Sequence, residues 1–471
     1  MKDNKSGCRA LFITPSRGLW KNEVERPWIS TQPLGLAYIA AAVRQAGFPT
    51  QVIDAYSLGL SAAEIRAQIQ DFRPRVVGIS ALTPQWPDAE IVAGIVKSVN
   101  PGILTVAGGP HVTALPDKAA SHPDVDIAVI GEGEQSMLEI CEAIAGEGSL
   151  EAVSGIVIGK DGALITTSAR ARYTELDKLP FPAHDLLPQT AFYNPFPAWG
   201  RKGNFSCIIS GRGCPYSCRF CDVTSQQGKR YRLRSAENVV DELSWVNATF
   251  GVTQFSFRDP SMICNHRRLL EICRLIGERG LDIAWTCNAR ANEVDPEILA
   301  VMKKAGCRLM QYGIEVGNAG MLKEIKNITR ERVTRAVSDT RRAGISAHGY
   351  FLFGFVEETP ETIEETISFA MELDLDSAGF AVMVPFPGTQ EFDNFRREGL
   401  LLTEDWRDYD IGSKPVYRHK NVTNEELMSA TRRAYRRFYL RPRIIAHHLR
   451  GVNSLQTVRT YVRSVRQTFF K

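Results

Sequence analysis

The sequence has no apolar run of the ~18 residues that a bilayer-spanning helix requires, and residues 1–15 are too short and too polar for a secretory signal. We therefore expect a cytoplasmic protein. The compositional bias of disordered, collagen-like and coiled-coil chains is also missing, because 44% of the 471 residues are hydrophobic and 23% are charged. The length predicts two to four domains with buried cores.

Acidic residues are missing from the last part of the chain. Residues 431–471 hold eleven of the 57 Lys and Arg and none of the 53 Asp and Glu, which leaves a net charge of −7 on residues 1–430. An apolar stripe at helical spacing runs through this segment and consists of Leu455, Val458, Val462, Val465 and Phe469. A basic amphipathic helix can lie peripherally on an anionic membrane, or it can pack on its own domain, which we favour. No nucleic-acid-binding motif accompanies the charge, so we expect no nucleic acid partner.

Residues 8–150 alternate short apolar runs with helical patterns, which predicts a doubly wound, Rossmann-like α/β domain. The expected strands are Ala10–Thr14, Gln51–Asp54, Val76–Ser80, Leu104–Ala107 and Asp126–Ile130. Ligands of such sheets bind beyond the carboxyl ends of the strands. Small residues gather at these ends, where a bulky cofactor would lie.

Residues 201–395 form a second alternating block. The expected strands are Phe205–Ile209, Thr253–Phe257, Asp282–Cys287, Leu309–Ile314, Ser346–Phe353 and Ala378–Val384. Six strand–helix units are too few for a complete eight-stranded barrel and predict a partial (β/α)6 TIM-type barrel, with chemistry on the loops that follow the strands. We expect residues 151–200 to be a hairpin and a linker, and residues 396–471 to be a helical, basic C-terminal region.

Three cysteines share one loop after the first strand of the second block, with the spacing C-x3-C-x2-C: Cys214, Cys218 and Cys221. Such thiolates favour a soft metal. Zinc would need a fourth ligand, for which Cys207 and Cys264 are the nearby candidates. A 4Fe–4S cluster held by three thiolates would leave one iron open to a substrate or cofactor.

With Phe220 in the aromatic position, this loop resembles the C-x3-C-x-aromatic-C hallmark of the radical S-adenosylmethionine (SAM) superfamily. The resemblance implies that Cys214, Cys218 and Cys221 hold a 4Fe–4S cluster whose open iron binds SAM. It also implies that one electron cleaves SAM to a 5′-deoxyadenosyl radical, which abstracts hydrogen from the substrate.

Later strand ends resemble further elements of the superfamily. Residues 350–357 are similar to its G-x-I-x-G-x-x-E strand against adenine, with Tyr350 in place of the first glycine. The SAM contacts that the resemblance implies are Phe220, Asp259, Arg290, Glu315, Leu352 and Gly354. Glu315 would accept hydrogen bonds from the ribose, Arg290 would pair with the carboxylate, and Asp259 would hold the amino group in place of a missing G-G-E element. A buried ion pair across the barrel is the alternative for Glu315 and Arg290.

The strand ends of the first domain resemble the cobalamin-binding pattern S-x-L followed by G-G. The cobalamin contacts that this implies are Ser80, Leu82, Gly108, Gly109, His111 and Gly131. The D-x-H-x-x-G element is missing because no histidine precedes His111, so cobalt would lack a protein histidine below it. We expect His111 to contact the nucleotide tail or to lie in the core. The alternative for the domain is a degenerate sheet that has lost cobalamin.

The order of the two domains resembles that of class B radical SAM methyltransferases and the anaerobic magnesium-protoporphyrin ester cyclase. It implies a cobalamin-dependent enzyme that moves a methyl group from methylcobalamin to an unactivated carbon. The alternatives are a cyclase, rearrangement or oxidation enzyme with the same cofactors, and a non-catalytic cobalamin or iron–sulfur carrier or sensor. The expected partners are a small-molecule substrate (a lipid, a tetrapyrrole or a secondary-metabolite scaffold) and a one-electron reductant such as flavodoxin or ferredoxin.

Overall fold

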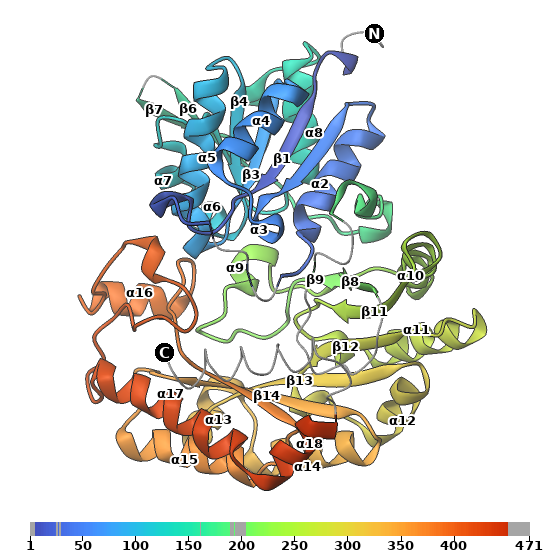
Figure 1. Cartoon of the computed structure of the whole chain (residues 1–471), viewed down its shortest axis with the longest axis vertical. Helices are drawn as coiled ribbons and strands as arrows, with labels where there is room; N and C mark the ends of the chain where they lie inside the picture. Colours follow the sequence, from blue (N-terminus) through green and yellow to red (C-terminus); the bar gives the residue numbers. More distant parts are fainter. Residues whose placement is uncertain are drawn as a thin grey trace.

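The computed structural model describes residues 5–24, 27, 30–160, 162–188, 193 and 204–450. Two α/β domains are stacked, and the view in Figure 1 has the first sheet with its helices above the second, curved sheet. None of the helices in the described part of the chain is long and apolar enough to cross a membrane.

The first sheet has the strand order β2-β1-β3-β4-β5-β6-β7. Its parallel strands β1 to β5 span Ala10–Thr14, Thr50–Asp54, Val76–Ser80, Leu104–Gly108 and Ile127–Val129. Successive side chains of β1 enter opposite cores because side chains alternate along a strand. Leu11 and Ile13 pack with α4 (Ala62–Phe72) and α5 (Trp86–Val99), whereas Phe12 packs with residues of α2 (Leu34–Gln45) and α8 (Glu134–Ile144). Helices therefore cover both faces, which confirms the doubly wound fold.

The hairpin expected in the linker belongs to this sheet instead. β6 (Ile156–Lys160) pairs antiparallel with β5, and β7 (Ala163–Thr166) pairs with β6. Ile156 and Val157 are fully buried, one in each core of the first domain. The pairing also covers the edge of β5, whose backbone groups would otherwise lack partners.

The second sheet is curved and has the strand order β8-β11-β12-β13-β14-β15. These parallel strands span Asn204–Ile208, Val252–Phe257, Ala284–Ala289, Cys307–Glu315, Ser346–Phe353 and Ser377–Val382. The connecting helices lie on the outside of the curve, as Figure 1 shows for α10 (Ala236–Phe250), α11 (His266–Glu278), α12 (Pro296–Lys304), α14 (Arg330–Arg342) and α15 (Pro360–Glu372). The six strands and outer helices confirm the partial barrel.

The C-terminal region covers the edge strand β15. On α17 (Asn424–Tyr439), the hydroxyl of Tyr435 accepts a hydrogen bond from Phe380 N, and that of Tyr439 bonds to both backbone groups of Ala378. The helices α16 (Gln390–Arg397) and α18 (Pro442–Arg450) complete this region. The apolar stripe expected at residues 455–469 lies outside the described residues.

Candidate functional site

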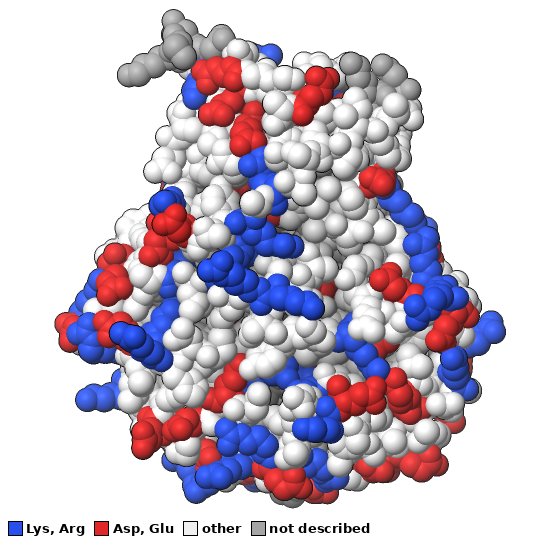
Figure 2. Space-filling view, turned by 180° about the vertical axis from the view of Figure 1, so that it is seen from behind, with Lys and Arg blue, Asp and Glu red and all other residues white. Residues whose placement is uncertain are grey.

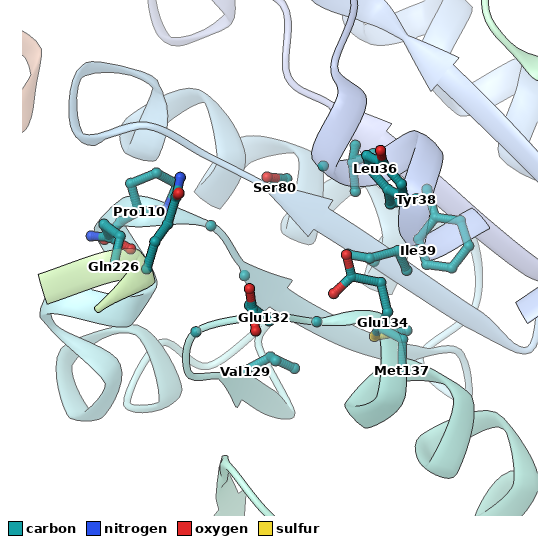
Figure 3. A pocket seen from close by; sticks show the side chains of 18 of the residues that line it. Leu36, Tyr38, Ile39, Ser80, Pro110, Val129, Glu132, Glu134, Met137 and Gln226 are labelled. Carbon is teal, nitrogen blue, oxygen red and sulfur yellow. The ribbon is translucent and has the colours of Figure 1, made fainter. Parts of the chain in front are cut away.

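A cavity of about 250 Å³ lies where the strand ends of the first sheet meet the second domain. We call it the glycine-lined cavity. Its lining includes, from the first domain, Ser80, Gly108, Gly109, Gly131, Glu132, Gly133 and Glu134, and from the second domain Gly211, Arg212 and Arg258. Figure 3 shows the side chains of Ser80, Glu132 and Glu134 around this space.

Glycine is required at two positions in this lining for different reasons. Gly109 has a φ of +97°, and a Cβ there would lie 2.9 Å from the Ser80 hydroxyl oxygen. Gly131 has a φ of +80°, and a Cβ there would meet no atom within 4 Å, so it would project into open space. Of the expected cobalamin contacts, the structure brings together Ser80, Gly108, Gly109 and Gly131.

Two of the residues expected to contact cobalamin lie elsewhere. His111 is 1% exposed, stacks on Trp86 with the ring centres 5.0 Å apart, and has Trp406 edge-on at 5.1 Å. Burial lowers its pKa to about 3, which keeps it neutral. His111 is thus a core residue that packs against two tryptophan rings. Leu82 is 51% exposed and lines two neighbouring cavities rather than this one.

The sequence does not predict an ion-pair network that lies at the glycine-lined cavity. Arg212 lies on β9 (Gly211–Arg212), and its guanidinium donates to Glu134 at 2.5 Å and to Glu132 at 3.2 Å. Arg232 donates to the other oxygen of Glu132 at 2.8 Å. The carboxylates come from the first domain and both arginines from the second, so the network joins the two domains. The only sequence signal is two glutamates at a strand end and an arginine two positions before Cys214.

The cysteine loop follows β9 directly. Its turns are held by backbone hydrogen bonds from Cys214 N to Gly228 O and from Cys221 N to Cys218 O, both 3.1 Å long. Burial raises the pKa of the Cys214 thiol and raises that of Cys221 to about 11. Among the described residues, no group of three His, Cys, Asp or Glu side chains forms a site for a metal ion. Cys207, one of the candidates for a fourth zinc ligand, lies buried in β8, where its backbone N–H donates to Gln32.

Three of the expected SAM contacts, Phe220, Arg290 and Glu315, lie on or beside this loop. Phe220 packs edge-on against Phe355 at 5.5 Å and lies under the Lys326 ammonium, which is 5.7 Å from its ring centre. Lys326 also forms a buried ion pair with Glu315 at 3.1 Å. Arg290 donates to the Lys326 carbonyl and, at 3.3 Å, to the Cys218 sulfur.

The remaining expected contacts lie on or just after strands of the barrel. Leu352 is partly buried on β14, and Gly354 follows it with a φ of +97°. A Cβ at Gly354 would lie 2.0 Å from the Tyr417 hydroxyl. Asp259 is fully buried, and its oxygens accept hydrogen bonds from Ser210 and Tyr231. These protein donors give Asp259 a role in holding the loop after β11, and its expected contact with SAM stays a prediction.

Arg219, between two of the cysteines, anchors the loop to three other segments. Its guanidinium pairs with Glu391 at 2.6 Å and Glu324 at 3.1 Å, and also with Glu357. The Arg219 carbonyl in turn accepts a hydrogen bond from Glu391 N at 3.1 Å. The cysteine loop is thereby fixed to α13 (Ala319–Lys326), to α16 and to the loop after β14.

Comparison with known proteins matches two domains. The B12 binding domain family matches residues 30–141, and the radical SAM superfamily matches residues 208–370. An uncharacterized methyltransferase of Pyrococcus horikoshii is 36% identical over 415 residues, which cover 88% of this chain and 89% of the relative. The anaerobic magnesium-protoporphyrin IX monomethyl ester cyclase of Rubrivivax gelatinosus is 29% identical over 442 residues, with 92% of this chain and 77% of the cyclase covered.

A solved structure shares the fold. The cobalamin-dependent S-adenosylmethionine radical enzyme OxsB, with aqua-cobalamin and SAM bound, aligns with a TM-score of 0.75 at 16% identity and covers 98% of this chain and 72% of its own. The matched domains, their order and the extent of the 36% identity agree with one another. The chain therefore belongs to the family of radical SAM enzymes with a B12-binding domain, which includes cobalamin-dependent methyltransferases.

Proposed function

We propose that this chain transfers a methyl group from cobalamin to an unactivated carbon of a small molecule by radical SAM chemistry. The observation that carries the proposal is the position of Arg212. It lies two residues before Cys214 and pairs with Glu132 and Glu134 of the glycine-lined cavity. The cysteine loop and the cavity are thereby joined, as a reaction that uses both cofactors needs.

Cys214, Cys218 and Cys221 would hold the 4Fe–4S cluster. Three thiolates on one loop fit a cluster that keeps one iron for a small-molecule ligand. Their burial favours the neutral thiols, so cluster assembly would release protons from Cys214 and Cys221. Arg290, 3.3 Å from the Cys218 sulfur, would donate a hydrogen bond that stabilises negative charge there.

Phe220, Arg290, Glu315, Leu352 and Gly354 would contact SAM. The Arg290 Nε atom is buried without a hydrogen-bond partner among the described residues. Buried donors are normally paired, and a carboxylate ligand would supply this pairing. The positive φ of Gly354 turns the chain after β14, where a side chain would collide with Tyr417.

Ser80, Gly108, Gly109 and Gly131 would line the site of the cobalamin nucleotide tail, because their small size leaves the glycine-lined cavity open. Leu82 would offer an apolar contact beside it. When bound, the cluster supplies the electron that cleaves SAM to a hydrogen-abstracting radical, and cobalamin supplies the methyl group. The protein's part is to orient these groups and exclude water.

The substrate would be a lipid, a tetrapyrrole or a secondary-metabolite scaffold. A further cavity of about 490 Å³, between the domains, is of a size that suits such a molecule. A flavodoxin or ferredoxin would supply electrons.

The proposal is tested by anaerobic purification, reconstitution with iron, sulfide and hydroxocobalamin, and assay with SAM and dithionite. Wild-type protein should bind both cofactors in stoichiometric amounts and form 5′-deoxyadenosine. A Cys214/Cys218/Cys221→Ala triple variant should bind cobalamin but form no 5′-deoxyadenosine. SAM cleavage without bound cobalamin would overturn the methyl-transfer mechanism, and bound cofactors without reductant-dependent cleavage would indicate a carrier or sensor.

The similarity to the cyclase of Rubrivivax gelatinosus favours a second candidate function, in which the substrate is cyclised without methyl transfer. Candidate substrates would be incubated with SAM labelled in its methyl group. Label in the product identifies methyl transfer, whereas 5′-deoxyadenosine with an unlabelled, altered skeleton identifies cyclisation, rearrangement or oxidation.

A further inference from the structure

A second cavity, of about 490 Å³, opens between the two domains, and we call it the interdomain cavity. Its lining includes Thr14, Asp54, Tyr56, Leu82 and Gln85 from the first domain and Phe205, Ser256, Arg258, Gln311 and Tyr350 from the second. Ser80 and Arg258 line both this cavity and the glycine-lined cavity, so the two are neighbours. A substrate placed here would lie beside the cofactor regions proposed above.

Arg258 differs from the other arginines at this boundary. Arg212, Arg232 and Arg234 are each buried against a glutamate. Arg258 follows β11, its side chain is exposed to the cavities, and no carboxylate of the described residues lies within ion-pair distance of it. Figure 2 shows one face of the molecule, on which some Lys and Arg side chains lie among acidic ones and others form a central group of cations.

The one carboxylate among the described residues of the lining, Asp54, already accepts hydrogen bonds from neutral donors. Asp54 is 1% exposed and accepts hydrogen bonds from the Thr14 and Tyr193 hydroxyls and from Ser57 N. It therefore does not neutralise Arg258. An arginine at the end of a barrel strand, facing a cavity without an acidic partner, favours an anionic ligand.

Tyr350 supplies the second half of the site. This position is glycine in the strand motif that residues 350–357 resemble, and here the ring is 41% exposed in the cavity. Its hydroxyl donates to Gln311 at 2.6 Å, and the edge-on ring of His348 lies 4.5 Å away. Gly379 on β15 makes room for it, because a Cβ there would lie 3.2 Å from the Tyr350 ring. The ring is thus held in place with one part open to a ligand.

We propose that the interdomain cavity binds a substrate with a flat, unsaturated body and an anionic group, the body against Tyr350 and the carboxylate or phosphate on Arg258. One molecule can make both contacts, because Arg258 and Tyr350 line the same cavity. This inference names the substrate class for the proposed methyl transfer and rests on it.

The test uses a pair of fluorescent probes that share an aromatic skeleton and differ in charge: 8-anilinonaphthalene-1-sulfonate (the anion) and N-phenyl-1-naphthylamine (neutral). Each is titrated into the full-length apoprotein. Arg258→Gln should weaken binding of the anion about 10-fold, equivalent to ~1.4 kcal/mol, and leave the neutral probe unchanged. Tyr350→Ala should weaken both. Arg267→Gln, an exposed arginine on α11 outside the cavity lining, is the matched control and should change neither.

The inference is overturned if Arg258→Gln leaves the affinity for the anion unchanged, or weakens both probes equally, since the effect would then concern shape rather than charge. It is also overturned if Arg258→Gln weakens hydroxocobalamin binding but not anion binding, because the anion recognised would then be the cobalamin phosphate. Failure of the proposed function is seen separately, as a wild-type protein that forms no 5′-deoxyadenosine.

Discussion

The guanidinium of Arg212 and the carboxylate of Glu134 form a buried ion pair 2.5 Å long that joins the strand before the cysteine loop to the strand ends of the first domain. The second oxygen of Glu134 is buried and has no hydrogen-bond partner among the described residues, although the residue lines the glycine-lined cavity. An unpaired buried acceptor is costly. A ligand that donates a hydrogen bond into this cavity would remove that cost.

Replacement of Glu134 is therefore expected to weaken the binding of one part of cobalamin, its nucleotide tail. The nucleotide tail carries ribose hydroxyls, which are hydrogen-bond donors, and cobinamide lacks this tail. Since a hydrogen bond to a charged group contributes about 1.5–3 kcal/mol, Glu134→Gln should weaken hydroxocobalamin binding by roughly 10-fold. Cobinamide binding should not change. Both affinities are measured by absorbance titration of the apoprotein.

The matched control is Glu139→Gln on the same helix, because Glu139 pairs with Arg170 and does not line the cavity. It should leave both affinities unchanged. Equal loss of hydroxocobalamin and cobinamide in Glu134→Gln would mean that the variant disturbs the domain rather than a contact with the tail.

Gly109 gives a prediction about the same cavity that concerns backbone strain. Alanine there would have to keep a φ of +97° with its Cβ 2.9 Å from Ser80 Oγ and Ala81 O. Gly109→Ala should lower the free energy of unfolding by about 1–3 kcal/mol and weaken cobalamin binding. Chemical denaturation of the apoprotein measures the first effect. Gly277→Ala is the control: a Cβ at this position of α11 meets nothing within 4 Å, so stability should rise by up to about 1 kcal/mol.

The strands were predictable because their signal is local. The bounds expected for Ala10–Thr14, Val76–Ser80 and Ser346–Phe353 are those of β1, β3 and β14. Short buried runs between helical patterns are enough to locate a parallel sheet. The spacing of the three cysteines is equally local, since all of them lie on one loop.

Contacts between distant residues were not predictable from the sequence. Arg212 and Glu134 are 78 residues apart, and no local pattern couples them. The same holds for burial: the sequence places Asp259 after a strand but does not show that Ser210 and Tyr231 occupy its oxygens. His111 likewise follows the glycine pair, yet Trp406 from the C-terminal region closes over it.

The Arg219 anchor predicts an effect on cluster retention. Glu391 is fully buried, and Arg219 lies 2.6 Å from it. Removing one member of a buried pair leaves an uncompensated charge, at a cost of about 3–5 kcal/mol. Arg219→Gln should therefore lower both the thermal midpoint of the apoprotein and the iron content after reconstitution. The iron content is measured by chemical analysis alongside the electron paramagnetic resonance signal of the reduced cluster.

The control for this prediction is a double variant. Adding Glu391→Gln to Arg219→Gln removes the stranded charge, so part of the lost stability should return while the iron content stays low. Independent, additive losses from the two changes would contradict a direct pair, because residues in contact show coupling energies.

Glu358, beside the turn after β14, predicts a pH dependence of stability. Burial raises its pKa to about 8, and one oxygen accepts hydrogen bonds from Gly354 N and Phe355 N. The other oxygen is buried without a partner in the described residues, which suits a protonated carboxyl. An unfolded chain ionises a glutamate near pH 4.5, so between that pH and about 8 the folded state holds a proton that the unfolded state has lost. Stability should therefore fall as pH rises through this window, by up to about 1.4 kcal/mol per pH unit.

Glu358→Gln mimics the neutral carboxyl and should remove this part of the decline in stability. Urea unfolding of both apoproteins from pH 5 to pH 8 measures it, and curves that stay parallel across the window would show that Glu358 is ionised in the folded protein.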